Sequence, residues 1–198
     1  DYANQYRNLV DRVRRREESG TMLDGLTEVV ARYHFKLMAY KDEYEVGRLY
    51  ANGAFQKKVG ELFEGNYKIR YHLAPPLFAK KDSETGHLKK KEFGPWVFGV
   101  FTVLSRLKFL RGTVFDVFGW TAERKMERQL IDDYHSLVEE IADTVDQTNI
   151  DVAKKLLSLP EDIRGFGHVK EASVIQVKQS WQVLLDEYRA RGAVRKAA

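Results

Sequence analysis

The chain has 198 residues, enough for one sizeable domain with its own hydrophobic core. Hydrophobic residues make up 43% of it and charged residues 31%, a balance that excludes a disordered chain and is typical of a soluble globular protein. The formal charge of +4 permits a polyanionic partner, although a solvated basic surface is the commoner meaning of such a charge.

The chain contains no cysteine, which excludes disulfides, thiolate zinc sites, iron–sulfur ligation and a cysteine nucleophile within these residues. No apolar run approaches the roughly 18 residues that a membrane span needs. We therefore expect a cytoplasmic protein that does not enter a membrane. Because the chain lacks an initiator methionine and opens within an amphipathic pattern, we also expect residues 1–198 to be a single domain from the C-terminal part of a much longer multidomain chain.

The first third of the chain has the periodicity of helices. Apolar residues recur at steps of three and four over residues 2–18, and again over residues 26–51, which predicts one long second helix. Gly47 lies within that helix, where it costs about 1 kcal/mol relative to alanine unless packing compensates. A short helix that runs through Phe63 follows.

The middle of the chain changes to alternating periodicity. The segment YKIRYHL (67–73) alternates aromatic or aliphatic residues with polar ones, the pattern of a strand. Residues 77–93 predict two further short strands around the turn DSETG (82–86), with lysines that point to water and protect the sheet edge. We therefore expect one small antiparallel hairpin or sheet around residues 67–93.

The second half of the chain returns to helical spacing. It predicts a helix over residues 95–110, then the aromatic connector RGTVFDVFGW (111–120), then a long helix over residues 122–145. Two further helices follow, one ending near Leu159 and the last beginning near His168. The sequence thus predicts a mainly α fold with some β structure (α+β), a bundle of amphipathic helices with one small antiparallel sheet.

Two glycines punctuate the loop LPEDIRGFGHVKEA (159–172) before the last helix. The loop lacks the GxxxxGK[ST] pattern of a phosphate loop and the preceding strand of a dinucleotide fingerprint. The residues favour a glycine-permitted turn with the next helix beginning at its end. The alternative is an anion site, in which backbone N–H groups at that helix N-terminus act together with nearby cations. The first candidate interaction surface therefore comprises Arg164, Gly165, Gly167, His168 and Lys170.

A second polar cluster lies in AYKDEYEV (39–46). An acidic catalytic cluster is one interpretation of it. The simpler one is the polar face of a helix, with Lys41 and Glu45 paired one turn apart. The second candidate surface comprises Lys41, Asp42, Glu43 and Glu45.

The histidines give no clear sign of catalysis or metal binding. His135 and Glu139 are one helical turn apart, a spacing that metals can use, but such a pair on a carboxylate-rich helix is typically solvent-facing. His34 lies beside a stripe of tyrosines, where we expect it to be partly buried and hydrogen-bonded. The sequence therefore predicts no catalytic, cofactor-binding or metal-binding residue in this chain.

The lysines of residues 80–91, with Phe93 and Trp96 close by, permit one further interpretation. Such a hairpin could hold single-stranded nucleic acid through charge and base stacking. The two aromatic residues flank the start of an apolar helix, however, and we expect them to be buried there. A stand-alone helical module that binds nucleic acid or another polyanion is therefore the alternative function, not the favoured one.

Five longer stretches together resemble one known domain. These stretches are YHFKLMAYKDEYEVGRLY (33–50), YKIRYHLAPPLFAKKD (67–82), KKEFGPW (90–96), FGWTAERKMERQLI (118–131) and IRGFGHVKEA (163–172). The chain resembles, over nearly its whole length, the C-terminal domain of the long single-chain indolepyruvate ferredoxin oxidoreductases, which belong to the 2-oxoacid:ferredoxin oxidoreductase family. It departs from that family's pattern at Gly47, where alanine is expected, at Val117, in place of proline, and at Trp120, in place of tyrosine.

The resemblance implies a parent enzyme that oxidatively decarboxylates arylpyruvates to acyl-coenzyme A and reduces ferredoxin. In that family thiamine diphosphate forms the carbanion, iron–sulfur clusters take the electrons, and coenzyme A is a co-substrate. The motifs that hold these groups are absent from the 198 residues. The resemblance therefore implies a non-catalytic accessory domain, which packs against other domains or subunits of the oxidoreductase or shapes the access of substrate, coenzyme A or ferredoxin.

Overall fold

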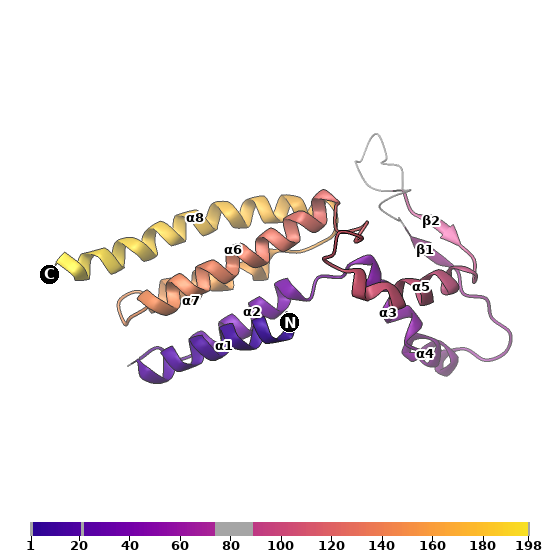
Figure 1. The fold of residues 1–198 in the computed structure, drawn as a ribbon, viewed down its shortest axis with the longest axis horizontal. Coiled ribbons are helices and arrows are strands. Elements are labelled where there is room, and N and C mark those ends of the chain that lie inside the picture. Colours follow the sequence, from indigo (N-terminus) through magenta and orange to yellow (C-terminus); the bar gives the residue numbers. More distant parts are fainter. Residues whose placement is uncertain (1, 21, 74–88, 198) are drawn as a thin grey trace. The chain divides into compact units, whose positions relative to one another are not determined.

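The computed structural model describes residues 2–20, 22–73 and 89–197. Its described residues form α-helices, two short 3-10 helices and a two-stranded antiparallel sheet (Figure 1), which confirms the predicted mainly α fold. The α-helices are α1 (Tyr2–Ser19), α2 (Leu26–Met38), α3 (Glu43–Ala51), α4 (Ala54–Leu62), α5 (Val97–Arg106), α6 (Ala122–Thr144), α7 (Ile150–Ser158) and α8 (His168–Ala197). The 3-10 helices are η1 (Leu107–Leu110) and η2 (Leu159–Asp162), and the strands are β1 (Tyr71–Leu73) and β2 (Lys91–Phe93).

The chain divides into two compact units, each with its own apolar core. Residues 1–40 and 126–198 form the first, called here the helical unit, and residues 41–125 form the second, called the sheet unit. Helix α6 begins in the sheet unit and continues into the helical unit. Within the described residues, no helix is both long enough and apolar enough to span a membrane.

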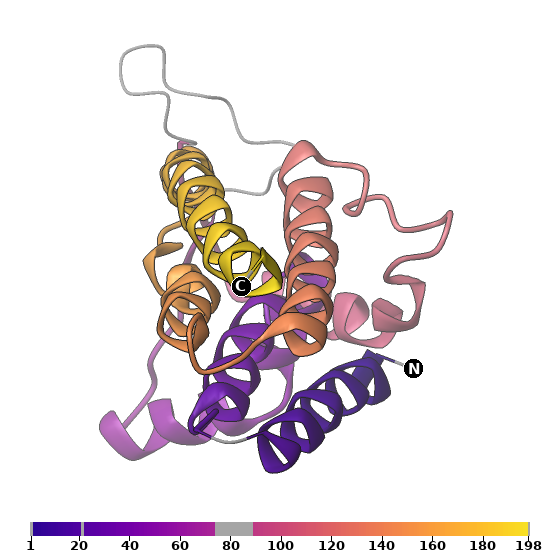
Figure 2. The same cartoon turned by 90° about the vertical axis from the view of Figure 1, so that its left-hand side faces the viewer.

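The helical unit is a bundle of α1, α2, α6, α7 and α8, which lie roughly side by side (Figures 1 and 2). Each helix turns one apolar stripe inward because its apolar residues recur at steps of three and four. Tyr134 of α6 is fully buried in this core, and its hydroxyl donates a hydrogen bond to the Leu157 carbonyl at 3.0 Å. The polar end of the ring is thereby satisfied, so the aromatic body can be buried without an unpaired donor.

The long helix predicted over residues 26–51 is wrong, because α2 ends at Met38 and α3 begins only at Glu43. Asp42 stands between them in extended conformation, and its side chain accepts a hydrogen bond from the Glu45 amide at 2.7 Å. This is an N-cap, which starts a new helix. The apolar spacing continues across the break, and periodicity alone therefore concealed it.

The sheet unit contains the predicted antiparallel pairing in a shorter form. Strands β1 and β2 pair with Tyr71 opposite Phe93. The predicted turn DSETG (82–86) and the strand predicted just before it lie outside the described residues. Behind the sheet, Tyr71 and Phe101 form a small core with Tyr50, whose ring stacks on that of Phe101 at 4.7 Å between centroids. The sheet is thus held mainly by aromatic packing on α3 and α5.

Gly47 allows α3 and α5 to pack closely. A Cβ atom at this position would lie 2.8 Å from Leu104 Cβ and 2.9 Å from the Phe101 carbonyl oxygen. Neither obstacle is the end of a flexible side chain, so a larger residue requires the two helices to separate. The close approach therefore compensates for the helix propensity that glycine loses at this position.

Candidate functional site

The glycine loop contributes to a small cavity in the helical unit, of about 110 Å³. Arg164, Gly165 and Lys170 from the first candidate surface line it, whereas Gly167 and His168 do not. The other lining residues are Lys36, Leu37, Tyr40, Glu127, Leu130 and Ile163. The cavity is therefore lined by both apolar and charged side chains.

The cations around this cavity are engaged in internal contacts. The Lys170 ammonium pairs with the carboxylate of Glu127, which is only 4% exposed. Arg164 lies 3.7 Å from the Glu161 carboxylate, and Lys36 donates to the Glu161 carbonyl at 2.8 Å. These contacts tie the loop to α2 and α6, so structural roles account for the charges.

The loop itself is the glycine-permitted turn that the sequence favoured, and α8 begins at His168 as predicted. Gly165 has a φ of +87°, and a Cβ there would lie 2.7 Å from Val169 Cγ1. Ser173 of α8 donates from its hydroxyl to the Arg164 carbonyl at 3.2 Å. The anion-site alternative stays a prediction, since no contact in the loop tests it.

The carboxylates of the second candidate surface form ion pairs within the sheet unit instead of a solvated helix face. Asp42 is 4% exposed and lies 2.7 Å from the guanidinium of Arg111. Glu43 pairs with Arg124 at 3.3 Å. Glu45 contacts the cations Arg48 and Lys108. Lys41 precedes the helix and is exposed. The acidic cluster is therefore part of the framework that fixes α3.

Glu45 shows the electrostatic consequence of these pairs. Its carboxylate lies 2.6 Å from the Arg48 guanidinium and 3.1 Å from the Lys108 ammonium. Hydrogen bonding by Arg48, with further help from Lys108, lowers the pKa of Glu45 to about 2. The predicted pair between Lys41 and Glu45 is wrong, because the helix that should hold both begins only at Glu43.

His34 is a titratable group buried in the core of the helical unit. It is 1% exposed, and its ring meets those of Tyr6, Tyr134 and His135 edge to face. Burial, and then the nearby charge of His135, lowers the pKa of His34 to about 4. The predicted burial is confirmed, but its Nδ1 has no hydrogen-bond partner among the described residues. His34 is thus a neutral core side chain at physiological pH.

The connector between η1 and α6 carries several large apolar side chains that are exposed to solvent. We define the connector face as the five exposed large apolar residues of η1 and of this segment. Their exposed fractions are 73% for Phe109, 75% for Val114, 71% for Phe115, 53% for Val117 and 65% for Trp120. Trp96, which we expected to be buried, is also 65% exposed.

The backbone of the connector is nevertheless well organised. Asp116 is 3% exposed, and its carboxylate accepts hydrogen bonds from the Gly112 and Gly119 amides, both at 2.9 Å. Phe118 points inward and packs edge to face on buried Tyr44, with 5.3 Å between ring centroids. Burial, and then the nearby Asp116 carboxylate, raise the pKa of Tyr44 to about 12.

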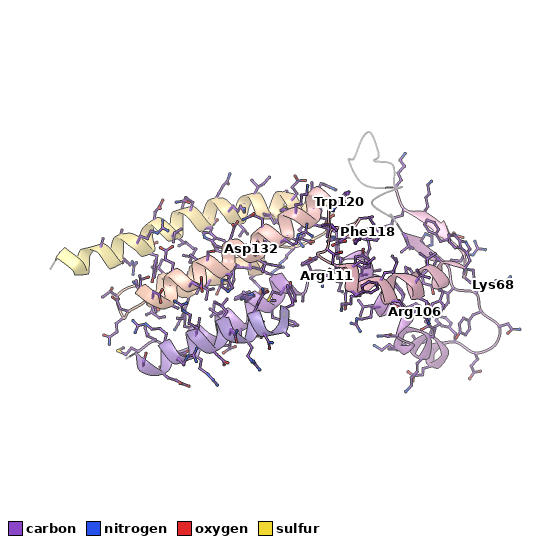
Figure 3. The ribbon with its side chains drawn as sticks, in the orientation of Figure 1. Lys68, Arg106, Arg111, Phe118, Trp120 and Asp132 are labelled. Atoms are coloured by element: carbon purple, nitrogen blue, oxygen red, sulfur yellow. The ribbon has the colours of Figure 1, made fainter. Side chains whose placement is uncertain are left out.

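Figure 3 shows Arg111, Phe118 and Trp120 along this connector, between α5 and the start of α6. Arg111 and Phe118 anchor the segment to α3, whereas Trp120 is left in solvent. The sequence revealed the aromatic composition of the connector but not its exposure. The available signal was an apolar run without either helical or strand periodicity, interrupted by a single aspartate.

Most titratable groups of the candidate surfaces are engaged in internal contacts. The carboxylates of the second candidate surface are held by cations or backbone amides, and His34 is sealed in the core. Among the described residues no group of three or more histidines and carboxylates could hold a metal ion. An ordered segment with exposed aromatic rings instead has the properties of a protein-contact surface.

Comparison with known protein families places the chain in the DUF6537 family, described as a family of unknown function, over residues 1–183. Since this match covers most of its length, the chain belongs to that family. No curated protein and no solved structure matches it.

Proposed function

We propose that this chain is a non-catalytic accessory domain of a cytoplasmic indolepyruvate ferredoxin oxidoreductase. It acts by packing against other domains or subunits of that enzyme, and thereby shapes the access of 2-oxoacid, coenzyme A or ferredoxin. The catalytic cofactors, thiamine diphosphate and iron–sulfur clusters, belong to the other parts of the enzyme. This role is one of assembly, and it requires a contact surface but no catalytic group.

The observation that carries this proposal is the contrast between satisfied charges and exposed apolar side chains. Asp42, Glu43 and Glu45 are occupied by internal ion pairs, so they are poor candidates for acid–base work. The connector face, by contrast, leaves large apolar groups in water, which is costly unless something covers them. The resemblance of five stretches to the oxidoreductase domain suggests which enzyme buries the connector face.

The first experiment measures the native polypeptide that carries the peptide IRGFGHVKEA. Proteins from the source cells are separated by size, digested and identified by mass spectrometry. The proposal expects this peptide in a product several times larger than the 23.0 kDa of this chain, together with peptides of a thiamine-diphosphate domain. A free product of about the size of this chain would overturn the proposal.

The second experiment removes residues 1–198 from that larger polypeptide. We expect the truncated enzyme to assemble poorly, or to show changed KM values for coenzyme A or ferredoxin. Retained thiamine diphosphate and iron–sulfur content, measured by absorbance and by metal analysis, shows that the catalytic parts remain folded. Unchanged assembly together with unchanged kinetic constants would refute the accessory role.

A further inference from the structure

We propose that the connector face is the docking site of this chain and that its occupant is a protein surface with an apolar centre and acidic surroundings, located on the catalytic part of the same enzyme. This inference rests on the proposed function and names the contact through which it operates. The residues concerned are those of the connector face defined above: Phe109, Val114, Phe115, Val117 and Trp120.

The exposed area is large enough to form the centre of a specific interface. Three aromatic rings and two valines, exposed by about half to three quarters, present on the order of 600 Å² of apolar surface. A standard interface buries about 800 Å² on each partner, of which the apolar core is the larger part. The connector face thus supplies most of what one side of such an interface requires, and its five exposed side chains lie within twelve consecutive positions of the chain.

The connector is also organised before any partner binds. Asp116 fixes the backbone through the Gly112 and Gly119 amides, and Phe118 anchors it to Tyr44. A segment held in one conformation loses little conformational entropy on binding, which raises affinity for a given area. Phe115 and Trp120 are therefore suited to be the dominant anchors, because aromatic residues are enriched in protein interfaces.

The net charge of the sheet unit favours an acidic partner. The sheet unit, residues 41–125, contains 16 lysines and arginines against 10 aspartates and glutamates, a net charge of +6. Arg106 and Lys125 lie close in sequence to the two ends of the connector and are exposed. Long-range attraction from this unit speeds the encounter with an acidic surface.

A protein fits this surface better than nucleic acid does. Two of the five side chains of the connector face are valines, which offer no ring for stacking on bases. The nearby cations Lys108 and Arg111 pair with Glu45 and Asp42, so they do not form the continuous positive groove with which single-strand binding proteins follow a phosphate backbone.

The test uses the double variant Phe115→Ser, Trp120→Ser in the 198-residue chain. Binding to the remainder of the larger polypeptide, purified without residues 1–198, is measured by surface plasmon resonance. We expect the affinity to fall on the order of a hundredfold. Phe166→Ser is the matched control, because Phe166 is 77% exposed but belongs to the helical unit, and we expect it to change affinity less than about twofold. Circular dichroism checks that each variant is folded.

A second variant tests the charge argument independently. Arg106→Glu leaves the apolar side chains and the Asp116 hydrogen bonds intact, and we expect it to slow association severalfold at low salt while the dissociation rate changes little. An association rate that is unaffected by both Arg106→Glu and salt would overturn the acidic character of the partner.

The outcomes separate this inference from the proposed function. If the wild-type chain does not bind the remainder at all, the proposed function itself fails. If the wild-type chain binds but the double variant binds equally well, the docking site lies elsewhere and only this inference fails. Binding of the wild-type chain to phosphatidylserine vesicles, to an oligothymidine strand or to a second copy of itself, lost in the double variant, would also overturn it, because the face would then have another occupant.

Discussion

Replacing Gly47 with alanine has two opposing effects on the stability of the protein, one from helix propensity and one from packing. Alanine is the better helix former by about 1 kcal/mol, so propensity alone predicts a more stable protein. The structure predicts the reverse, because the new Cβ would lie 2.8 Å from Leu104 Cβ and 2.9 Å from the Phe101 carbonyl oxygen. Real Cβ contacts are not this short, so α3 and α5 must move apart.

The cost of that movement exceeds the gain in propensity. Overpacking a tight site typically costs about 1–3 kcal/mol, and here the upper half of that range applies because the obstacles, a Cβ atom and a backbone carbonyl, cannot turn away. Separating the helices also disturbs the stack of Tyr50 on Phe101, which connects α3 to the core of the sheet unit. We therefore expect Gly47→Ala to lower the free energy of unfolding by roughly 1–2 kcal/mol.

Urea denaturation followed by circular dichroism measures this change, and Gly99→Ala is the matched control. Gly99 lies in α5, is exposed, and a Cβ added to it would meet no atom within 4 Å, so alanine there should stabilise by about 0.5–1 kcal/mol. Equal stabilisation by both substitutions would refute the close packing of α3 on α5. It would also agree with the alanine that the oxidoreductase resemblance leads one to expect at position 47.

Three further changes test other parts of the structure. The free energy of unfolding should fall as the pH drops from about 6.5 towards about 4, because His34 takes up a proton at its ordinary pKa in the unfolded chain but only near pH 4 in the folded one. The loss should be at most about 3 kcal/mol. Urea titrations at several pH values measure it, and His34→Phe should not show it. Gly165→Ala should destabilise by at least about 1 kcal/mol more than Gly167→Ala, since both have positive φ but only the former would meet Val169, and thermal melts compare them. Asp116→Ala should accelerate hydrogen exchange of the two glycine amides that its carboxylate holds, and unchanged exchange would contradict the proposed order of the connector.

The sequence was a good guide to helices with one continuous apolar stripe. The long helix predicted over residues 122–145 corresponds to α6, and the last helix begins at His168 as expected. Periodicity fails where a break preserves the spacing, as at Asp42, because the apolar positions on both sides still differ by three or four. The signal for the break was the aspartate itself, whose short side chain caps a helix start.

The candidate sites were harder to predict because the sequence does not show which residue a charged side chain pairs with. Asp42 and Glu43 look like a solvated helix face in the sequence, but their partners Arg111 and Arg124 are about 70 to 80 positions further along the chain. Such pairing is set by tertiary structure and leaves no local pattern. The exposure of Trp96 and Trp120 was not predicted, because large aromatic residues are mostly buried in soluble domains and the sequence shows no sign that these two are exceptions.

The position of Asp116 connects these observations. A buried carboxylate in the middle of an apolar segment is costly unless it is hydrogen-bonded, and the two glycine amides meet that need. If covering Val114, Phe115 and Val117 within the chain were the only requirement, an apolar residue at position 116 would allow the segment to collapse inward. The aspartate instead fixes a turn in which these side chains are exposed. The connector is thus ordered while its apolar residues are exposed, and both properties are what the proposed docking of another protein surface requires.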